Sequence, residues 1–335
     1  MNRTDFANIL NTTTEWESCT QKELIDRTLP INKAIKEIIP DKLFRYRQCN
    51  DNNIKAFKQD SVYAVTADKF NDPYDTLLRY DVKSIEQNFK HLCTDHVLLL
   101  KNHILSNGFP SFIKNTFPED ILQMIRNKLI SAEDITTLME ELNTNREYAL
   151  TWIASLSSVI EMIVKRSVTL ACFCESVQSV IMWSHYAQEH QGFALEYRPQ
   201  LLLNSPMKNI AIFPVIYNKE RFDASSYYFC LLLKMFGMPI DNPDIFAQFK
   251  CVLHKSPEWE YEKEWRLIDA SPRNILQIDH SCIPLKPHAI YYGKNISKEN
   301  KNELHIIAQT KEIQEYDMYI DNASINYEML YRPLN

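Results

Sequence analysis

The sequence predicts an α+β protein, in which strands and helices mix without the regular strand–helix–strand order of an α/β fold. Short segments rich in β-branched and aromatic residues lie at irregular intervals between longer segments with helical periodicity. Hydrophobic residues make up 45% of the 335 residues, which is enough for a substantial core. Glycine occurs only four times and never in a cluster, which excludes the glycine-rich phosphate loops of nucleotide-binding α/β folds.

The chain is expected to divide into an N-terminal helical extension, residues 1–40, and a single α+β domain, residues 41–335. The extension has one apolar stripe with helical spacing that ends at Pro40, formed by Ile31, Ala34, Ile35, Ile38 and Ile39. Between about 81 and 165 the apolar residues also recur at helical spacing, so a large helical insertion is expected to interrupt the domain.

The other elements of the domain follow from local pattern. Strands are predicted at 42–47, 61–66, 167–174, 192–197, 210–217, 264–268, 289–292 and 313–320. Helices are predicted at 50–58, 180–188, 224–253 with a break at 237–239, and 297–310. Together these segments favour a mixed or antiparallel sheet core.

Charge and composition limit the classes of function. The net charge is −6, so nucleic-acid contact is expected only in a local cleft. No apolar run reaches the roughly 18 residues of a membrane span. No apolar stretch follows the polar first residues, so no signal peptide is expected. The eight cysteines include no CxxC pair. We therefore expect a cytoplasmic protein with reduced thiols, no membrane contact and no metal site.

Two arginines occupy alternate positions of the first predicted strand. Arg45 and Arg47 then share one face, where two guanidinium groups repel each other unless anions lie between them. The pattern indicates either a phosphate or carboxylate site or a solvated, salt-bridged strand face.

A polar turn follows the second predicted strand. Phe70-Asn-Asp-Pro-Tyr-Asp75 has the turn chemistry of an Asn-Asp-Pro segment, and Tyr63 lies on the strand before it. The segment fits either a binding loop or a well-capped turn.

The third dense cluster is Met182-Trp-Ser-His-Tyr186. Ser184 and His185 are neighbours on a predicted helix, so their side chains diverge and do not form a nucleophile–base pair. Trp183 and Tyr186 share a helix face, which fits either plain packing or contact with a ligand.

The fourth cluster is Trp259-Glu-Tyr-Glu-Lys-Glu-Trp-Arg266. In an extended segment, Glu260, Glu262 and Glu264 share a face, where they repel one another unless a cation or a cationic transition state is present. Glu264 starts an apolar run and is expected to lie deeper than Glu262. A solvent-facing acidic edge is the alternative.

These motifs, together with Ile290-Tyr-Tyr-Gly293, resemble in order those of a bacterial family catalogued as domain of unknown function 2971, from about Leu43 to about Ile320. That family name implies no activity.

A more distant resemblance is to the ADP-ribosyltransferase superfamily, which implies an ADP-ribosyltransferase-like sheet core. It implies NAD as substrate, with Glu264 and Glu262 catalytic and Tyr63 stacked on nicotinamide. The cofactor-binding residues it implies are Arg45, Arg47, Phe70, Asn71, Asp72, Trp183, Ser184, His185 and Tyr186. We accordingly expect Arg45 or Arg47, Tyr63, the Asn71-Asp72 turn, His185 and Glu264 to line one pocket.

Three functions remain open from the sequence. The first is an NAD-dependent transferase, such as a toxin or anti-phage effector, with an unknown nucleic-acid or protein acceptor and a regulatory or antitoxin partner. The second is a metal-dependent hydrolase or nuclease built on Glu260, Glu262, Glu264 and Asp72. The third is a binding module without catalysis.

Overall fold

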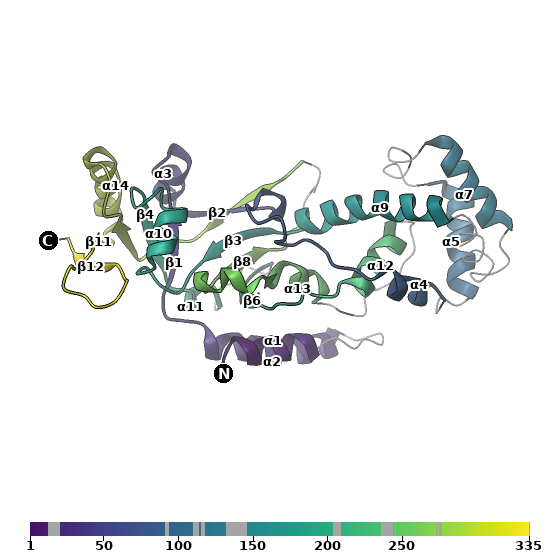
Figure 1. Ribbon diagram of the computed structural model, residues 1–335, viewed down its shortest axis with the longest axis horizontal. Coiled ribbons are helices and arrows are strands. Elements are labelled where there is room, and N and C mark those ends of the chain that lie inside the picture. Colours follow the sequence, from purple (N-terminus) through teal and green to yellow (C-terminus); the bar gives the residue numbers. More distant parts are fainter. Residues whose placement is uncertain are drawn as a thin grey trace.

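The computed structural model describes residues 1–12, 21–90, 94–109, 114, 118–131, 146–203, 209–235, 244, 246–272, 274 and 277–334. Within them the α+β class is confirmed: two five-stranded sheets and one two-stranded sheet are combined with helices of very different length. The molecule is elongated, with strands at one end and the helices of the 81–165 region at the other (Figure 1).

The first sheet has the order β1-β4-β10-β11-β12. Its strands are β1 (Leu43–Arg47), β4 (Phe193–Tyr197), β10 (Ala289–Tyr292), β11 (Gln314–Tyr319) and β12 (Leu330–Pro333). All neighbours are antiparallel except β10 and β11, which are parallel and joined by the crossover helix α14 (Lys298–Lys311). The edge strand β1 carries Arg45 and Arg47, opposite Leu195 and Phe193 of β4.

The second sheet has the order β5-β8-β3-β2-β9 and is antiparallel throughout. Its strands are β5 (Ile210–Pro214), β8 (Trp265–Asp269), β3 (Thr169–Phe173), β2 (Ser61–Val65) and β9 (His280–Pro284). An isolated antiparallel bridge between Phe44 and Cys174 joins the edge of the first sheet to the end of β3. One apolar core extends under both sheets.

A second, separate core holds the helical region together. It combines residues of α4 (Val82–Lys90), α5 (Thr94–Asn107), α7 (Glu119–Ser131) and α9 (Arg146–Arg166) with residues of α12 (Ser225–Met235). Figure 1 shows α9 running from the sheets toward α5 and α7, with α12 alongside. The insertion therefore packs on a helix from the second half of the chain, which local periodicity does not reveal.

The N-terminal helices α1 (Arg3–Thr12) and α2 (Gln21–Ile38) lie side by side along one side of the molecule (Figure 1). Phe6, Leu10, Ile31 and Ala34 are buried in the main core. The extension is thus packed on the sheets. No helix among the described residues is long and apolar enough to cross a bilayer.

The remaining elements are short and connect the sheets. They are α3 (Asp51–Lys58), η1 (Ala67–Lys69), α10 (Val180–Tyr186), α11 (Gln200–Leu203), β6 (Ile216–Tyr217), α13 (Ala247–Leu253), β7 (His254–Lys255) and η2 (Pro257–Glu262). Asn50 caps α3 by accepting a hydrogen bond from the Asn53 amide, as the sequence predicts. The predicted break at 237–239 lies outside the described residues.

Candidate functional site

A cleft of about 280 Å³ lies beside the bridge that joins the two sheets. Its walls come from β1, β3, α10, the segment after β2, and the chain around β7 and η2. The polar residues that line it are Arg45, Tyr46, Arg47, Lys69, Asn71, Asp75, Cys172, Tyr186, Lys255, Glu262 and Glu264. Segments far apart in the sequence therefore converge here, and each of the four dense clusters noted in the sequence contributes at least two residues to the lining.

The acidic wall is organised around one ammonium group. Lys255 Nζ lies 2.6 Å from Glu262 Oε2 and 2.9 Å from Glu264 Oε2. Tyr186 donates its hydroxyl to the other oxygen of Glu262 at 2.6 Å. Burying either carboxylate without a partner is costly, so this shared cation allows both to lie in the interior.

Local backbone geometry brings these two carboxylates together. Residues 257–262 form a turn of 3-10 helix, and Lys263 then adopts the left-handed conformation with φ of 44°. This turn lets Glu262 and Glu264 reach the same ammonium. Left-handed backbone is costly for a side-chain-bearing residue and is concentrated at sites where the surrounding structure enforces it.

The expected extended glutamate face is therefore wrong. Glu260 lies on the 3-10 turn and is exposed, whereas Glu262 and Glu264 are 5% and 2% exposed. The reason is the short helix begun by Ser256 and Pro257, which overrides the strand-like alternation of the glutamates. Glu264 is less exposed than Glu262, as expected, but the difference between the two exposed fractions is small.

Behind Glu264 lies a fully buried ion pair. Arg266 donates to both oxygens of Asp75, at 2.8 and 2.6 Å, and its Nε donates to Glu264 Oε1 at 2.8 Å. Phe70 lies against the guanidinium, 5.3 Å from ring centre to carbon. Arg266 therefore holds the Glu264 carboxylate in place, and its bidentate pair with Asp75 links the polar turn to β8.

The pKa values of Glu262 and Glu264 shift in opposite directions. Burial raises the pKa of Glu262, and this effect prevails over the opposing charge of Lys255. For Glu264 burial acts in the same direction, but the charges of Arg266 and Lys255 outweigh it and hold the pKa well below the usual range. Such a divergent pair is typical of an acid–base site, with one group able to take a proton and one fixed as an anion.

The basic wall contrasts with this network. Arg45 is nine-tenths buried and donates to the Tyr63 carbonyl, but among the described residues no carboxylate pairs with it and its Nε has no partner. Burial lowers its pKa. Arg47 donates to the Tyr46 carbonyl, at 3.2 Å, and no carboxylate of the described segments forms an ion pair with it. Two guanidinium groups that have no counter-ion among the described residues thus line the cleft from β1.

Two residues of the α10 motif, Met182 and Tyr186, line the cleft. Trp183 is fully buried, donates to the Val177 carbonyl and packs edge-on against Tyr46, so its role is packing. Ser184 contacts His190 rather than His185, and its hydroxyl donates to the Val180 carbonyl. His185 lies outside the cleft against Tyr261.

The residues expected to converge do so only in part. Arg45, Arg47, Phe70, Asn71, Tyr186, Glu262 and Glu264 line the cleft. Tyr63 does not: it is 43% exposed and stacks on His280, because β2 presents it on the face away from the cleft. Asp72 turns into a neighbouring cavity, and Trp183, Ser184 and His185 stay outside the lining.

Sequence reasoning missed four residues that build the site: Lys255, Asp75, Arg266 and Arg3. Lys255 follows α13 in a segment that gives no signal of its own. Arg3 on α1 donates to the Glu264 carbonyl at 2.8 Å and pairs with Glu175. Only Arg266 and Asp75 had a usable signal, since both sit in clusters already noted as dense in charge.

No group of three or more His, Cys, Asp or Glu residues suited to a metal ion occurs in the part of the chain that the structure describes. At the acidic wall, Lys255 occupies the position between the carboxylates.

Comparison with known proteins gives one finding. A family model described as a protein of unknown function (DUF2971) matches residues 182–267, which include the α10 motif, Lys255 and both glutamates of the cleft. The Arg45–Arg47 and Phe70–Asp75 motifs and Gly293 lie outside the match. Neither the curated proteins nor the solved structures gave a match. The chain is therefore similar, over residues 182–267, to the DUF2971 family.

Proposed function

We propose that the cleft binds NAD, cleaves the bond between nicotinamide and ribose, and transfers ADP-ribose to an acceptor. The observation that carries the proposal is the presence, within one cleft, of two guanidinium groups that no described carboxylate neutralises and of two carboxyl groups whose pKa values shift in opposite directions. An anionic substrate with a glycosidic bond needs both features.

Binding is assigned to the basic wall. A buried cation without a counter-ion is costly, and a pyrophosphate placed between Arg45 and Arg47 would relieve this cost with charge-assisted hydrogen bonds. Phe70 lines the same cleft and, since Tyr63 lies elsewhere, provides an aromatic surface for the nicotinamide ring.

Bond cleavage is assigned to the acidic wall. As the carbon–nitrogen bond breaks, its electron pair leaves with nicotinamide, which departs neutral, and the ribose develops oxocarbenium character. Glu264, held as an anion by Arg266 and Lys255, stabilises that charge. Glu262, with its raised pKa, accepts the proton that the acceptor nucleophile loses as it attacks the ribose.

Tyr186 and Lys255 position Glu262. Each holds one of its oxygens, at 2.6 Å in both cases, so the carboxylate is fixed before substrate arrives. Preorganised groups of this kind supply a large part of enzymatic rate acceleration, because no reorganisation is needed during the reaction.

The experiment is nicotinamide release from NAD, measured with added magnesium and with a chelator. Wild-type protein should release nicotinamide equally in both. Glu262→Gln keeps the shape and the Tyr186 hydrogen bond, and should lower turnover by about 100- to 1000-fold while the melting temperature changes little. Glu260→Gln, on the exposed side of the same turn, is the matched control and should behave as wild type.

Two results would contradict the proposal. One is a folded wild-type protein that releases no nicotinamide under any condition, as a binding module would. The other is near-wild-type release by Glu262→Gln. A magnesium-dependent hydrolysis of another substrate would instead favour the metal-dependent alternative, which requires Glu260 to join the other two glutamates.

A further inference from the structure

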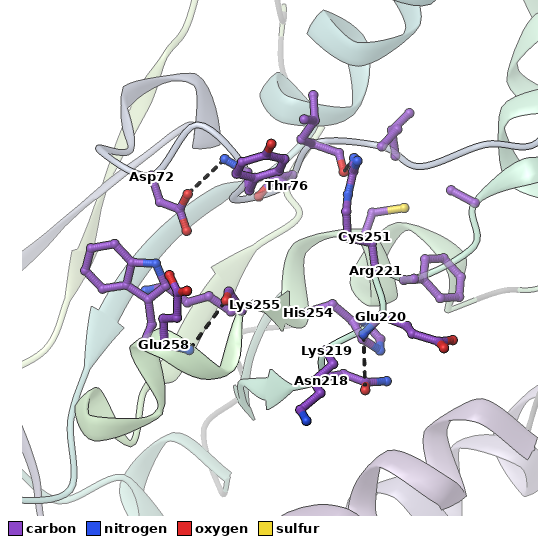
Figure 2. Close-up of a pocket in the computed structure, with 17 residues that line it drawn as sticks. Asp72, Thr76, Asn218, Lys219, Glu220, Arg221, Cys251, His254, Lys255 and Glu258 are labelled. Carbon is purple, nitrogen blue, oxygen red and sulfur yellow. Dashed lines mark hydrogen bonds between the residues drawn. The ribbon is translucent and has the colours of Figure 1, made fainter.

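A second cavity of about 330 Å³ adjoins the cleft (Figure 2). It lies between the segment 72–78, the loop 218–224, and the chain from Cys251 to Trp259. Three of its residues, Leu78, Ala224 and Cys251, belong to the second apolar core, so the cavity sits where the sheets meet the helical region.

The cavity and the cleft share a wall. Phe70, Asn71 and Asp75 face the cleft, whereas Asp72, Tyr74 and Thr76 face the cavity. Thr76 has φ of 59°, which is unfavourable for a β-branched residue. Lys255 lines both spaces. The polar turn therefore acts as a thin, strained partition that presents different side chains to its two sides.

One end of the cavity is acidic. Asp72 is only 9% exposed; one oxygen accepts the Tyr74 amide hydrogen at 2.9 Å, and no described residue forms an ion pair with it. Glu258 lies at the same end in Figure 2, next to Lys255. The Lys255 ammonium does not neutralise them, because it is held by Glu262 and Glu264 on the cleft side. A nearly buried carboxylate without a cation favours binding of one.

Aromatic rings accompany these carboxylates. Tyr74 and Trp259 both line the cavity. The guanidinium carbon of Arg221 already lies 5.7 Å from the Tyr74 ring centre, and the Lys255 ammonium lies 4.9 Å from that of Trp259. Flat cations bind well between carboxylates and aromatic faces, since the ring quadrupole attracts them and the fork of a guanidinium matches a carboxylate.

We propose that this second cavity is a binding site for an alkylguanidinium group, held by Asp72 with support from Glu258 and the rings of Tyr74 and Trp259. The inference is independent of the proposed function, because it rests on residues that do not line the cleft.

The test is calorimetric titration of the full-length protein, without NAD, with n-butylguanidine as the guanidinium probe and n-butylamine as the ammonium probe of equal charge. Wild-type protein should bind n-butylguanidine, and bind n-butylamine about tenfold or more weakly. Asp72→Asn should weaken n-butylguanidine binding by at least about tenfold, the worth of one charge-assisted hydrogen bond. The amide keeps an oxygen for the Tyr74 hydrogen bond, so the variant is expected to fold.

Glu220→Gln is the matched control, since Figure 2 places Glu220 at the other end of the cavity, and it should bind within about twofold of wild type. Glu258→Gln should cause a smaller loss than Asp72→Asn. The proposal is overturned if wild type does not bind n-butylguanidine at millimolar concentration, if n-butylamine binds equally tightly, or if Asp72→Asn binds n-butylguanidine with unchanged affinity. Failure of NAD cleavage would leave these results unaffected.

Discussion

The two walls of the cleft treat buried charge in opposite ways. On the acidic wall, each buried carboxylate has a cation: Lys255 bridges Glu262 and Glu264, and Arg266 bridges Glu264 and Asp75. On the basic wall, Arg45 is equally enclosed but no described carboxylate pairs with it.

The difference predicts two roles for buried charge: the paired groups stabilise the fold, and Arg45 is available to a ligand. A buried charge that has lost its partner costs several kcal/mol, so removing the partner of a buried charge that has no second one should destabilise the fold strongly. A cation that is already uncompensated has no such partner to strand, and its removal should affect ligand affinity more than folding.

Removing Arg266 should have the greatest effect on stability. Arg266→Met leaves Asp75 as a buried anion without its cation and leaves Glu264 with Lys255 alone, so we expect the free energy of unfolding to fall by about 3–5 kcal/mol. Arg79→Met is the matched control, because the Arg79–Asp223 pair is about half exposed and should cost less than about 1 kcal/mol. Denaturant unfolding of both variants measures the difference; equal losses would contradict the contrast.

Removing Arg45 should act on affinity instead. In Arg45→Met we expect binding of ADP-ribose, measured by calorimetry, to weaken by about 10- to 100-fold, as for loss of a hydrogen bond to a charged group. The free energy of unfolding should stay the same or rise, because an unpaired buried cation is removed. A loss of stability as large as that of Arg266→Met would show that Arg45 serves the fold.

The two glutamates should give pH effects of opposite sign. Burial raises the pKa of Glu264, but the charges of Arg266 and Lys255 lower it by more, so the net shift is downward. The contribution of Glu264 to stability is therefore complete above the ordinary glutamate pKa of about 4.3 and is lost as pH falls below it. Burial raises the pKa of Glu262. The contribution of Glu262 to stability is therefore complete below the ordinary glutamate pKa and is lost as pH rises through its folded-state pKa.

Unfolding free energy measured against pH separates these contributions. Glu264→Gln should reduce the dependence of the unfolding free energy on pH below about 4.3. Glu262→Gln should reduce this dependence above about pH 4.3. Identical profiles for the two variants would show that their environments do not differ as the structure indicates.

The smallest effect is expected at the N-terminal helix. Arg3→Ala removes hydrogen bonds to the Glu264 and Val215 carbonyls and a half-buried pair with Glu175, and should lower the free energy of unfolding by about 1 kcal/mol. Nicotinamide release should fall with it, since the Glu264 backbone loses a support. Unchanged release and stability would mean that α1 does not support the site.

Local pattern predicted most strands and short helices of the domain, because each has its own signal. The cap of α3 at Asn50 and strand β10 at 289–292 are examples. Strands β9 and β12 were missed, since their burial is low and their sequences show little apolar alternation. The extended reading of the glutamate cluster failed because Pro257 starts a 3-10 turn.

The site was harder to predict than the fold. Arg45 and Arg47 could be placed on one strand, and Glu262 and Glu264 near each other, from spacing alone. Lys255 and Arg3 could not, because their role depends on which segments the fold brings together. Tyr63 illustrates the limit: its strand was predicted, but which face of β2 meets the cleft is set by the pairing with β3 and β9.

The central claim is that the unpaired arginine serves the ligand and the paired arginine serves the fold. Its most direct test is thermal unfolding of wild type, Arg45→Met and Arg266→Met, each with and without NAD. NAD should raise the melting temperature of wild type but not of Arg45→Met, whose melting temperature without NAD should be equal to or higher than that of wild type. Arg266→Met should melt far lower in both conditions. An equal NAD-induced rise in Arg45→Met and wild type, or no rise in wild type, would contradict it.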